Sequence, residues 1–147
     1  MLEIKDLNVF YGNVQILWDV NLKIEKGEIV TLVGANGAGK TTLLNAITGL
    51  VPPASGSVSF RDVDITGMLP NEVVELGIAY LPEGGRLFPD MTILENLEMG
   101  GYLKNSWKKK KGRLEEVYQI FPLLKERSKQ LAKTLSGGYV PCGAIVT

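Results

Sequence analysis

The stretch Gly34-Ala35-Asn36-Gly37-Ala38-Gly39-Lys40-Thr41-Thr42 decides the fold of this chain. Its spacing is glycine, four residues, then glycine, lysine and threonine, which is the P-loop or Walker A pattern. Glycines at 37 and 39 let backbone N–H groups converge on phosphate oxygens. Lys40 adds a positive charge for the β- and γ-phosphates, and Thr41 offers its hydroxyl to Mg²⁺. The pattern predicts a site for a nucleoside triphosphate, formed by Gly34, Asn36, Gly37, Ala38, Gly39, Lys40, Thr41 and Thr42.

The motif lies between a predicted strand and a predicted helix. The apolar run 29–33 before it is typical of a buried strand, and Leu43, Leu44 and Ile47 after it share one helical face. A helix that begins there directs the positive end of its dipole at the phosphates. The alternative is a glycine-rich turn with a chance lysine, which the two flanking elements disfavour.

Composition is typical of a soluble globular protein of one domain. The chain has 147 residues, 45% hydrophobic and 22% charged, and its formal net charge of zero does not favour a nucleic-acid partner. One cysteine, Cys142, and an N-terminus without a secretory signal favour the cytosol. No apolar run reaches about 20 residues, the length that crosses a bilayer. Histidine is absent, which excludes histidine catalysis and histidine metal sites within these residues.

Two half-exposed strands are predicted ahead of the motif. Leu2 and Ile4 alternate with charged neighbours, and the alternation resumes at Leu7 one position out of phase, which predicts a bulge. The chain turns at Tyr11-Gly12, and a second strand ends near Ile24. Tyr11 is therefore expected at the mouth of the site, where its ring could stack on a base, although a Tyr-Gly pair alone indicates only a turn.

Further elements follow the motif. Gly49 is a candidate cap for the first helix, and 56–60 reads as a short edge strand. A short helix is predicted to begin at Pro70 and to be capped by Gly77, followed by a buried strand over 78–81 beside the P-loop strand.

Two helices are predicted near the end. Thr92 and Glu95 form a capping box that begins a helix ending at Gly100-Gly101. The second carries Leu114, Val117, Tyr118 and Phe121 on one face and ends at Pro122. The basic run 108–111 between them is interpreted as a solvated linker rather than a contact for phospholipid or nucleic acid.

The chain resembles the ATP-binding subunit of an ABC transporter over residues 1 to 138. Besides the P-loop, Leu135-Ser136-Gly137-Gly138 is identical to the signature motif of that family, and Pro82-Glu83-Gly84-Gly85-Arg86 is similar to the loop of its branched-chain amino-acid importers, with Gly85 as a departure. The resemblance implies an α/β fold: a P-loop NTPase (ABC ATPase) core with a small N-terminal antiparallel sheet and a helical subdomain, truncated at the C-terminus.

The resemblance also implies roles for residues outside the P-loop. Tyr11 matches the aromatic residue that stacks on adenine, so the implied cofactors are ATP and Mg²⁺. Ser136, Gly137 and Gly138 would contact the ATP of a second subunit in a head-to-tail dimer. Most of the family has glutamine where this chain has Glu83, which we interpret as a metal ligand alongside Thr41; the alternative is a loop glutamate in solvent.

The implied domains are a nucleotide-binding core over 1–90, a helical subdomain over 91–138 that ends in the signature, and an unrelated tail over 139–147. In the family a strand follows that carries the Walker B aspartate and the catalytic glutamate, so no catalytic residue is intact here. Truncation, a frameshift or deliberate shortening would each produce this tail. Loss of that strand predicts low stability or self-association.

The implied partners are membrane-embedded transporter subunits and a second ATP-binding subunit, with no nucleic acid and no direct membrane insertion. The expected location is therefore cytoplasmic, at the inner face of the cell membrane through partner subunits. Phe88, Met91 and Trp107 are the candidate docking surface, with core packing as the alternative. The favoured function is the ATPase of a branched-chain amino-acid importer. The rivals are a soluble ABC ATPase of translation or repair, and a fragment that binds ATP without turnover.

Overall fold

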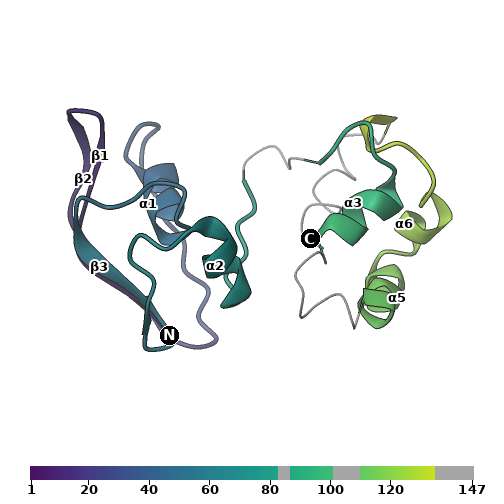
Figure 1. Cartoon of the computed structure of the whole chain (residues 1–147), viewed down its shortest axis with the longest axis horizontal. Coiled ribbons are helices and arrows are strands. Elements are labelled where there is room, and N and C mark those ends of the chain that lie inside the picture. Colours follow the sequence, from purple (N-terminus) through teal and green to yellow (C-terminus); the bar gives the residue numbers. More distant parts are fainter. Residues whose placement is uncertain (83–86, 101–109, 135–147) are drawn as a thin grey trace. The chain divides into compact units, whose positions relative to one another are not determined.

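The computed structural model describes residues 1–82, 87–100 and 110–134, and the chain falls into two compact units, Met1–Tyr80 and Leu81–Thr147. The first unit contains β1 (Leu2–Tyr11), β2 (Val14–Ile24), α1 (Lys40–Ile47), β3 (Ser55–Phe60), β4 (Val63–Asp64) and α2 (Pro70–Glu75). The second contains α3 (Ile93–Gly100), α5 (Lys110–Ile120), α6 (Pro122–Glu126) and a 3₁₀ turn at Ala132–Thr134. Figure 1 shows these elements. The division at residues 90 and 138 stays a prediction.

The strands of the first unit form one antiparallel sheet in the order β2-β1-β3-β4. The predicted bulge in β1 is confirmed, since the register with β2 shifts between Ile4 and Leu7 and Asp6 has a φ of 47°. Asp19 in β2 has a φ of 45°, and the register shifts again there, so the two irregularities lie on either side of the Leu7–Val20 pair. Two side-chain amides tie the bends together: Asn8 Nδ2 donates to Asp19 Oδ1 at 2.8 Å, and Asn21 Nδ2 donates to Asp6 Oδ1 at 3.0 Å.

Strand β3 packs against β1 at a point where only glycine fits. A Cβ on Gly56 would overlap the carbonyl oxygens of Lys5 and Asp6, and Gly56 has a φ of 87°. The prediction that 56–60 is an edge strand is wrong, because β4 pairs along its other side. Arg61 and Asp62 make that connection with φ values of 49° and 65°, the left-handed pair that tight two-residue hairpins require.

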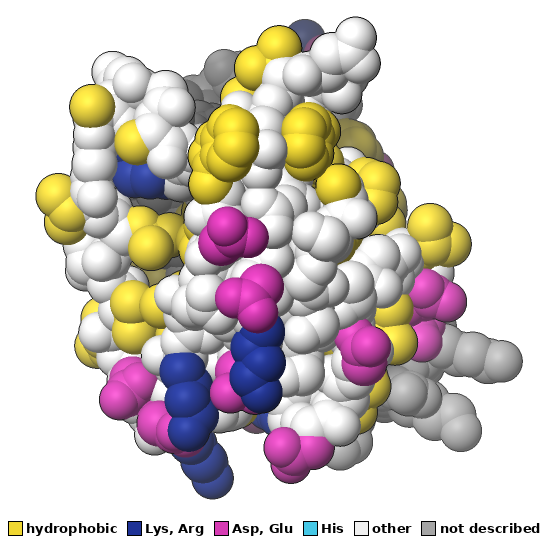
Figure 2. All heavy atoms as spheres, turned by 90° about the vertical axis from the view of Figure 1, so that its left-hand side faces the viewer, with side chains coloured by type: hydrophobic (Ala, Val, Ile, Leu, Met, Phe, Trp, Pro, Cys, Tyr) yellow, Lys and Arg dark blue, Asp and Glu magenta, His cyan; other side chains and the backbone are white. Residues whose placement is uncertain are grey.

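One face of the sheet packs on α1 and forms the core of the first unit, as the side-by-side arrangement in Figure 1 shows. The core residues are Ile4, Leu7, Val9, Leu17, Leu43, Ala46, Ile47, Val58, Phe60 and Ile65. The predicted helical face thus supplies Leu43 and Ile47, whereas Leu44 is exposed. Helix α1 ends as expected, with Gly49 in the left-handed region at φ 75° just after the C-cap Thr48. Figure 2 shows the opposite face of this unit, where charged side chains gather below a group of hydrophobic ones.

Two predicted strands are wrong. Residues 29–33 and 78–81 belong to no strand or helix, and the first segment is not buried: Ile29 is 98% exposed and Val33 is 91% exposed. A parallel strand is stable only when neighbouring strands and helices cover it. The described residues supply no parallel neighbour to either segment, so their apolar character does not produce strands.

The helices of the second unit follow the sequence pattern closely. Ile93, Leu97, Tyr118 and Leu124 form its core, and Leu114, Val117 and Phe121 pack against them, which confirms the predicted face. Pro122 ends α5 as predicted, but it also occupies the first position of α6, which was not predicted. Helix α5 begins at Lys110, so the last two lysines of the run interpreted as a linker are helical. Of the helices that the structure describes, none is long and apolar enough to cross a membrane.

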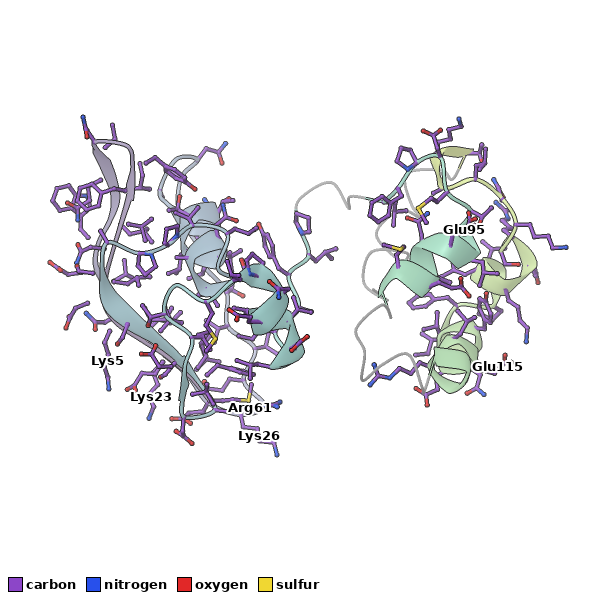
Figure 3. The ribbon with its side chains drawn as sticks, in the orientation of Figure 1. Lys5, Lys23, Lys26, Arg61, Glu95 and Glu115 are labelled. Carbon is purple, nitrogen blue, oxygen red and sulfur yellow. The ribbon has the colours of Figure 1, made fainter. Side chains whose placement is uncertain are left out.

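The capping box at the start of α3 is confirmed. Thr92 donates from its backbone N–H and its hydroxyl to Glu95 Oε2, each at 2.7 Å, and Glu95 N–H donates to Thr92 Oγ1 at 3.2 Å. These hydrogen bonds lower the pKa of Glu95 below its ordinary value, and the one from the Thr92 backbone has a larger effect than the one from the Thr92 hydroxyl. Glu95 is labelled on α3 in Figure 3.

Candidate nucleotide site

The P-loop is bent by two glycines in the left-handed region. Gly37 has a φ of 85° and Gly39 a φ of 86°, a conformation that side-chain-bearing residues rarely adopt. Gly39 is also the N-cap of α1. The first helical hydrogen bond here runs from Leu43 N–H to Gly39 O at 2.9 Å, so the amides of residues 40–42 are those that a helix start leaves for an outside acceptor. The loop and helix therefore fit a bound phosphate chain, because both present donors and the positive end of a dipole.

Lys40 closes the loop on itself. Its Nζ donates to Gly34 O at 2.7 Å and to Ala35 O at 2.8 Å, and Ala38 N–H donates to Ala35 O at 3.2 Å. The ammonium group is thereby held within the ring of backbone that the motif forms. A charge held there is in position to attract the β- and γ-phosphates of a nucleotide.

The cations of the first unit that Figure 3 labels lie away from this loop. Figure 3 shows Lys5, Lys23, Lys26 and Arg61 at the end of the unit near the N-terminus. Lys5 forms an ion pair with Glu3 at 2.9 Å, and Lys23 forms one with Glu25 at 2.7 Å. The pKa of Lys23 is raised, mainly by its hydrogen bond to Glu25 and secondly by the negative charge of Glu25. The positive potential at the loop thus comes from Lys40 and from backbone dipoles.

The threonines after the lysine face different surroundings. Thr41 is exposed on the first turn of α1, where its hydroxyl is accessible to a metal ion held by the phosphates. Thr42 is only 7% exposed and is one of the buried residues of α1. Within the described ranges, no three of histidine, cysteine, aspartate or glutamate lie close enough together to hold a metal.

Tyr11 lies at the end of β1, beside the two-residue loop Gly12-Asn13. Its side chain is 47% exposed, and it pairs with Val14 across the hairpin. In the view of Figure 1 this hairpin end and the loop that enters α1 lie at the same end of the first unit. An accessible ring at that end is what stacking on a base requires.

Four of the predicted site residues lie outside the described residues: Glu83, Ser136, Gly137 and Gly138. The same is true of Trp107 in the candidate docking surface and of Cys142. Their predicted roles stay predictions.

Asn96 fixes the backbone of Phe88, a contact that the sequence pattern missed. It is 4% exposed in α3, accepts a hydrogen bond from Phe88 N–H at 2.8 Å and donates to Phe88 O at 3.0 Å. Despite this double restraint on its backbone, the Phe88 side chain is 52% exposed. The sequence signal that could have revealed this contact is an asparagine within the apolar face of a predicted helix, because a buried amide needs hydrogen-bond partners.

A protein-family model described as "ABC transporter" matches residues 17–145 of this chain. The chain belongs to the ABC transporter family. Among curated proteins, this ABC transporter chain is 42% identical to the high-affinity branched-chain amino acid transport ATP-binding protein BraG of Pseudomonas aeruginosa, over 94% of this chain and 59% of that protein. It is 40% identical to the probable branched-chain amino acid transport ATP-binding protein LivF of Archaeoglobus fulgidus, over 94% of this chain and 58% of that protein.

Solved structures agree with this family. An ATP-binding subunit of an ABC transporter superposes with a TM-score of 0.80 at 30% identity, over 99% of this chain and 60% of that one. A dimeric ATP-binding cassette bound to ADP and Pi in a post-hydrolysis state gives a TM-score of 0.79 at 28% identity, over 99% of this chain and 68% of that one. The ABC transporter chain therefore has the fold of part of such a cassette, and it spans about three-fifths of the length of the curated relatives that it matches.

Proposed function

We propose that this ABC transporter chain binds ATP with Mg²⁺, and that the protein to which it belongs couples ATP hydrolysis to the import of branched-chain amino acids. One observation carries the nucleotide site: the loop 34–39, bent by left-handed glycines and closed by Lys40, leads directly into α1. It offers a phosphate chain converging amides, a point charge and a helix dipole. The transported substrate is proposed from the names of the relatives BraG and LivF.

Each proposed site residue has a separate task. Tyr11 stacks on the adenine, the backbone of 34–39 surrounds the phosphates, and Lys40 contacts the β- and γ-phosphates. Thr41 and Glu83 are the proposed Mg²⁺ ligands, and the ion, when bound, neutralises charge on the phosphates. Ser136, Gly137 and Gly138 contact the nucleotide of a second subunit in a head-to-tail dimer.

Tyr11→Ala tests the nucleotide site. Removal of the ring should weaken ATP binding by about 1 to 3 kcal/mol, the range measured for aromatic stacking on bases, which is about five- to 150-fold in Kd. The measurement is calorimetric titration with Mg²⁺–ATP, and Lys40→Ala is the control that should lose most of the binding. An affinity within about twofold of the wild type would remove Tyr11 from the site, and unchanged binding by Lys40→Ala would refute the site itself.

The docking surface is proposed in the second unit. Phe88 is held by Asn96 with an exposed ring, and the segment that carries it is joined to a second one by backbone hydrogen bonds, from Ala132 N–H to Met91 O at 2.9 Å and from Lys133 N–H to Pro89 O at 3.1 Å. An apolar side chain on such a rigid support is suited to a partner that covers it. We propose that the partner is a membrane-embedded subunit, so that the protein lies in the cytoplasm at the inner face of the membrane.

Phe88→Ala tests this partner. Co-purification with the membrane subunits of a branched-chain amino-acid importer should fall by about tenfold or more, as for an interface anchor. Ile120→Ala is the matched control, because Ile120 is 69% exposed on α5 and should have no effect. Equal recovery of both variants would refute the surface. Failure of the wild type to retain any membrane subunit would favour a soluble ABC ATPase instead.

A further inference from the structure

Leu17 of β2 lies directly beneath the P-loop. A Cβ placed on Gly39 would be 2.7 Å from Leu17 Cδ2, and 3.5 Å from both Cγ2 and the carbonyl oxygen of Ile16. Leu17 itself is 5% exposed and belongs to the core between the sheet and α1. The absence of a side chain at Gly39 therefore allows its backbone to rest on the leucine methyl group.

This contact is the place where the loop is attached to the sheet. Every residue from 25 to 38 is exposed, and Gly39 is the first buried residue after the end of β2. The hydrogen bonds of the Lys40 ammonium run within the loop, to the carbonyl oxygens of Gly34 and Ala35. The depth of the loop relative to the sheet is thus set at Gly39, by the side chain under it.

The same strand pair carries the proposed base-stacking residue. Leu17 pairs with Val9, and two residues beyond Val9 along β1 is Tyr11, which pairs with Val14. A single hairpin therefore supports Gly39 through Leu17 and presents Tyr11 at its end. We propose that Leu17 is a positioning residue for nucleotide binding: it fixes the height of the P-loop relative to Tyr11, so that base and phosphates are bound at the same time. This inference rests on the proposed nucleotide-binding function.

The test compares two nucleotides that share a base but differ in phosphates. In Leu17→Ala the loop can sink into the space left, so we expect Mg²⁺–ATP affinity to fall by about tenfold, because three phosphates need the loop at its correct height. AMP, which lacks the β- and γ-phosphates that the loop surrounds, should lose no more than about twofold. Leu17→Met, which conserves volume, should restore most of the ATP affinity.

Ile4→Ala is the matched control, because Ile4 is 1% exposed in the same core and loses the same number of carbon atoms. It should lower the thermal midpoint as Leu17→Ala does and leave the ratio of ATP to AMP affinity unchanged. If Leu17→Ala does not fold, Leu17→Ile keeps the volume but moves the methyl group under Gly39, and it should lower ATP affinity selectively by several-fold.

Equal losses for ATP and AMP, or the same ratio in the Leu17 and Ile4 variants, would overturn the positioning role while leaving the nucleotide site intact. A wild-type chain that binds neither nucleotide would refute the proposed function instead.

Discussion

A polypeptide of these 147 residues alone is expected to bind Mg²⁺–ATP without hydrolysing it at the rate of an ABC ATPase. Phosphoryl transfer to water needs a phosphate cradle, a metal held from two sides and a residue that orients the attacking water. The loop 34–39 with Lys40 is the proposed cradle, and Thr41 and Glu83 are the proposed ligands on one side of the metal. The residues after the signature, 139–147, contain no aspartate, glutamate or histidine to complete it.

Loss of one positioned catalytic group lowers a rate by about 10²- to 10⁴-fold, so two missing groups should leave turnover far below the usual range of about 1 to 10³ per second. Single-turnover release of phosphate, measured on the preparation used for ATP titration, checks this expectation. Lys40→Ala separates hydrolysis at this site from that of a contaminant. Lys40-dependent hydrolysis at about one per second or faster would contradict the prediction.

Gly56→Ala is expected to destabilise the first unit by about 3 to 5 kcal/mol. Two effects add: alanine is strained at the φ of 87°, and its methyl group would overlap the carbonyl oxygens of Lys5 and Asp6 in β1. Backbone carbonyls in a paired strand cannot rotate away, so relief requires β1 and β3 to separate. Since whole domains are stable by only about 5 to 15 kcal/mol, this loss should remove a large part of the stability of the first unit.

Gly67→Ala is the matched control for this effect. Gly67 also has a positive φ, 68°, but a Cβ there would meet nothing within 4 Å. It should therefore cost only the backbone strain, about 1 to 2 kcal/mol. Urea unfolding followed by far-ultraviolet circular dichroism gives both values. Equal losses in the two variants would mean that the close approach of β3 to β1 does not limit stability.

Local signals predicted the helical features well. The Thr92 and Glu95 capping box, the end of α5 at Pro122 and the left-handed Gly49 after α1 each depend on residues within one or two turns of the chain. The bulge at Asp6 was visible because a shift in alternation records it directly.

Features that depend on distant partners were not predictable in this way. The run 29–33 has the composition of a buried strand, but composition does not say which strand pairs with it, and no described strand does. Three contacts arise only from proximity in three dimensions. They are the hydrogen bonds from Lys40 to the loop carbonyls, the contact of Leu17 with Gly39, and the hydrogen bonds between Asn96 and the Phe88 backbone. Residues of the right type could be named from the motif, whereas the residues that position them could not.

The paired bends at Asp6 and Asp19 also affect how this sheet behaves in concentrated solution. Strand β2 is long and lies at one edge of the described sheet, and such an edge normally offers a row of N–H and C=O groups to another molecule. The left-handed Asp19 interrupts that row midway, and its carboxylate is already bonded to Asn8 of the neighbouring strand. An incoming strand cannot keep register across the interruption, so the bend protects the edge from sheet-to-sheet aggregation.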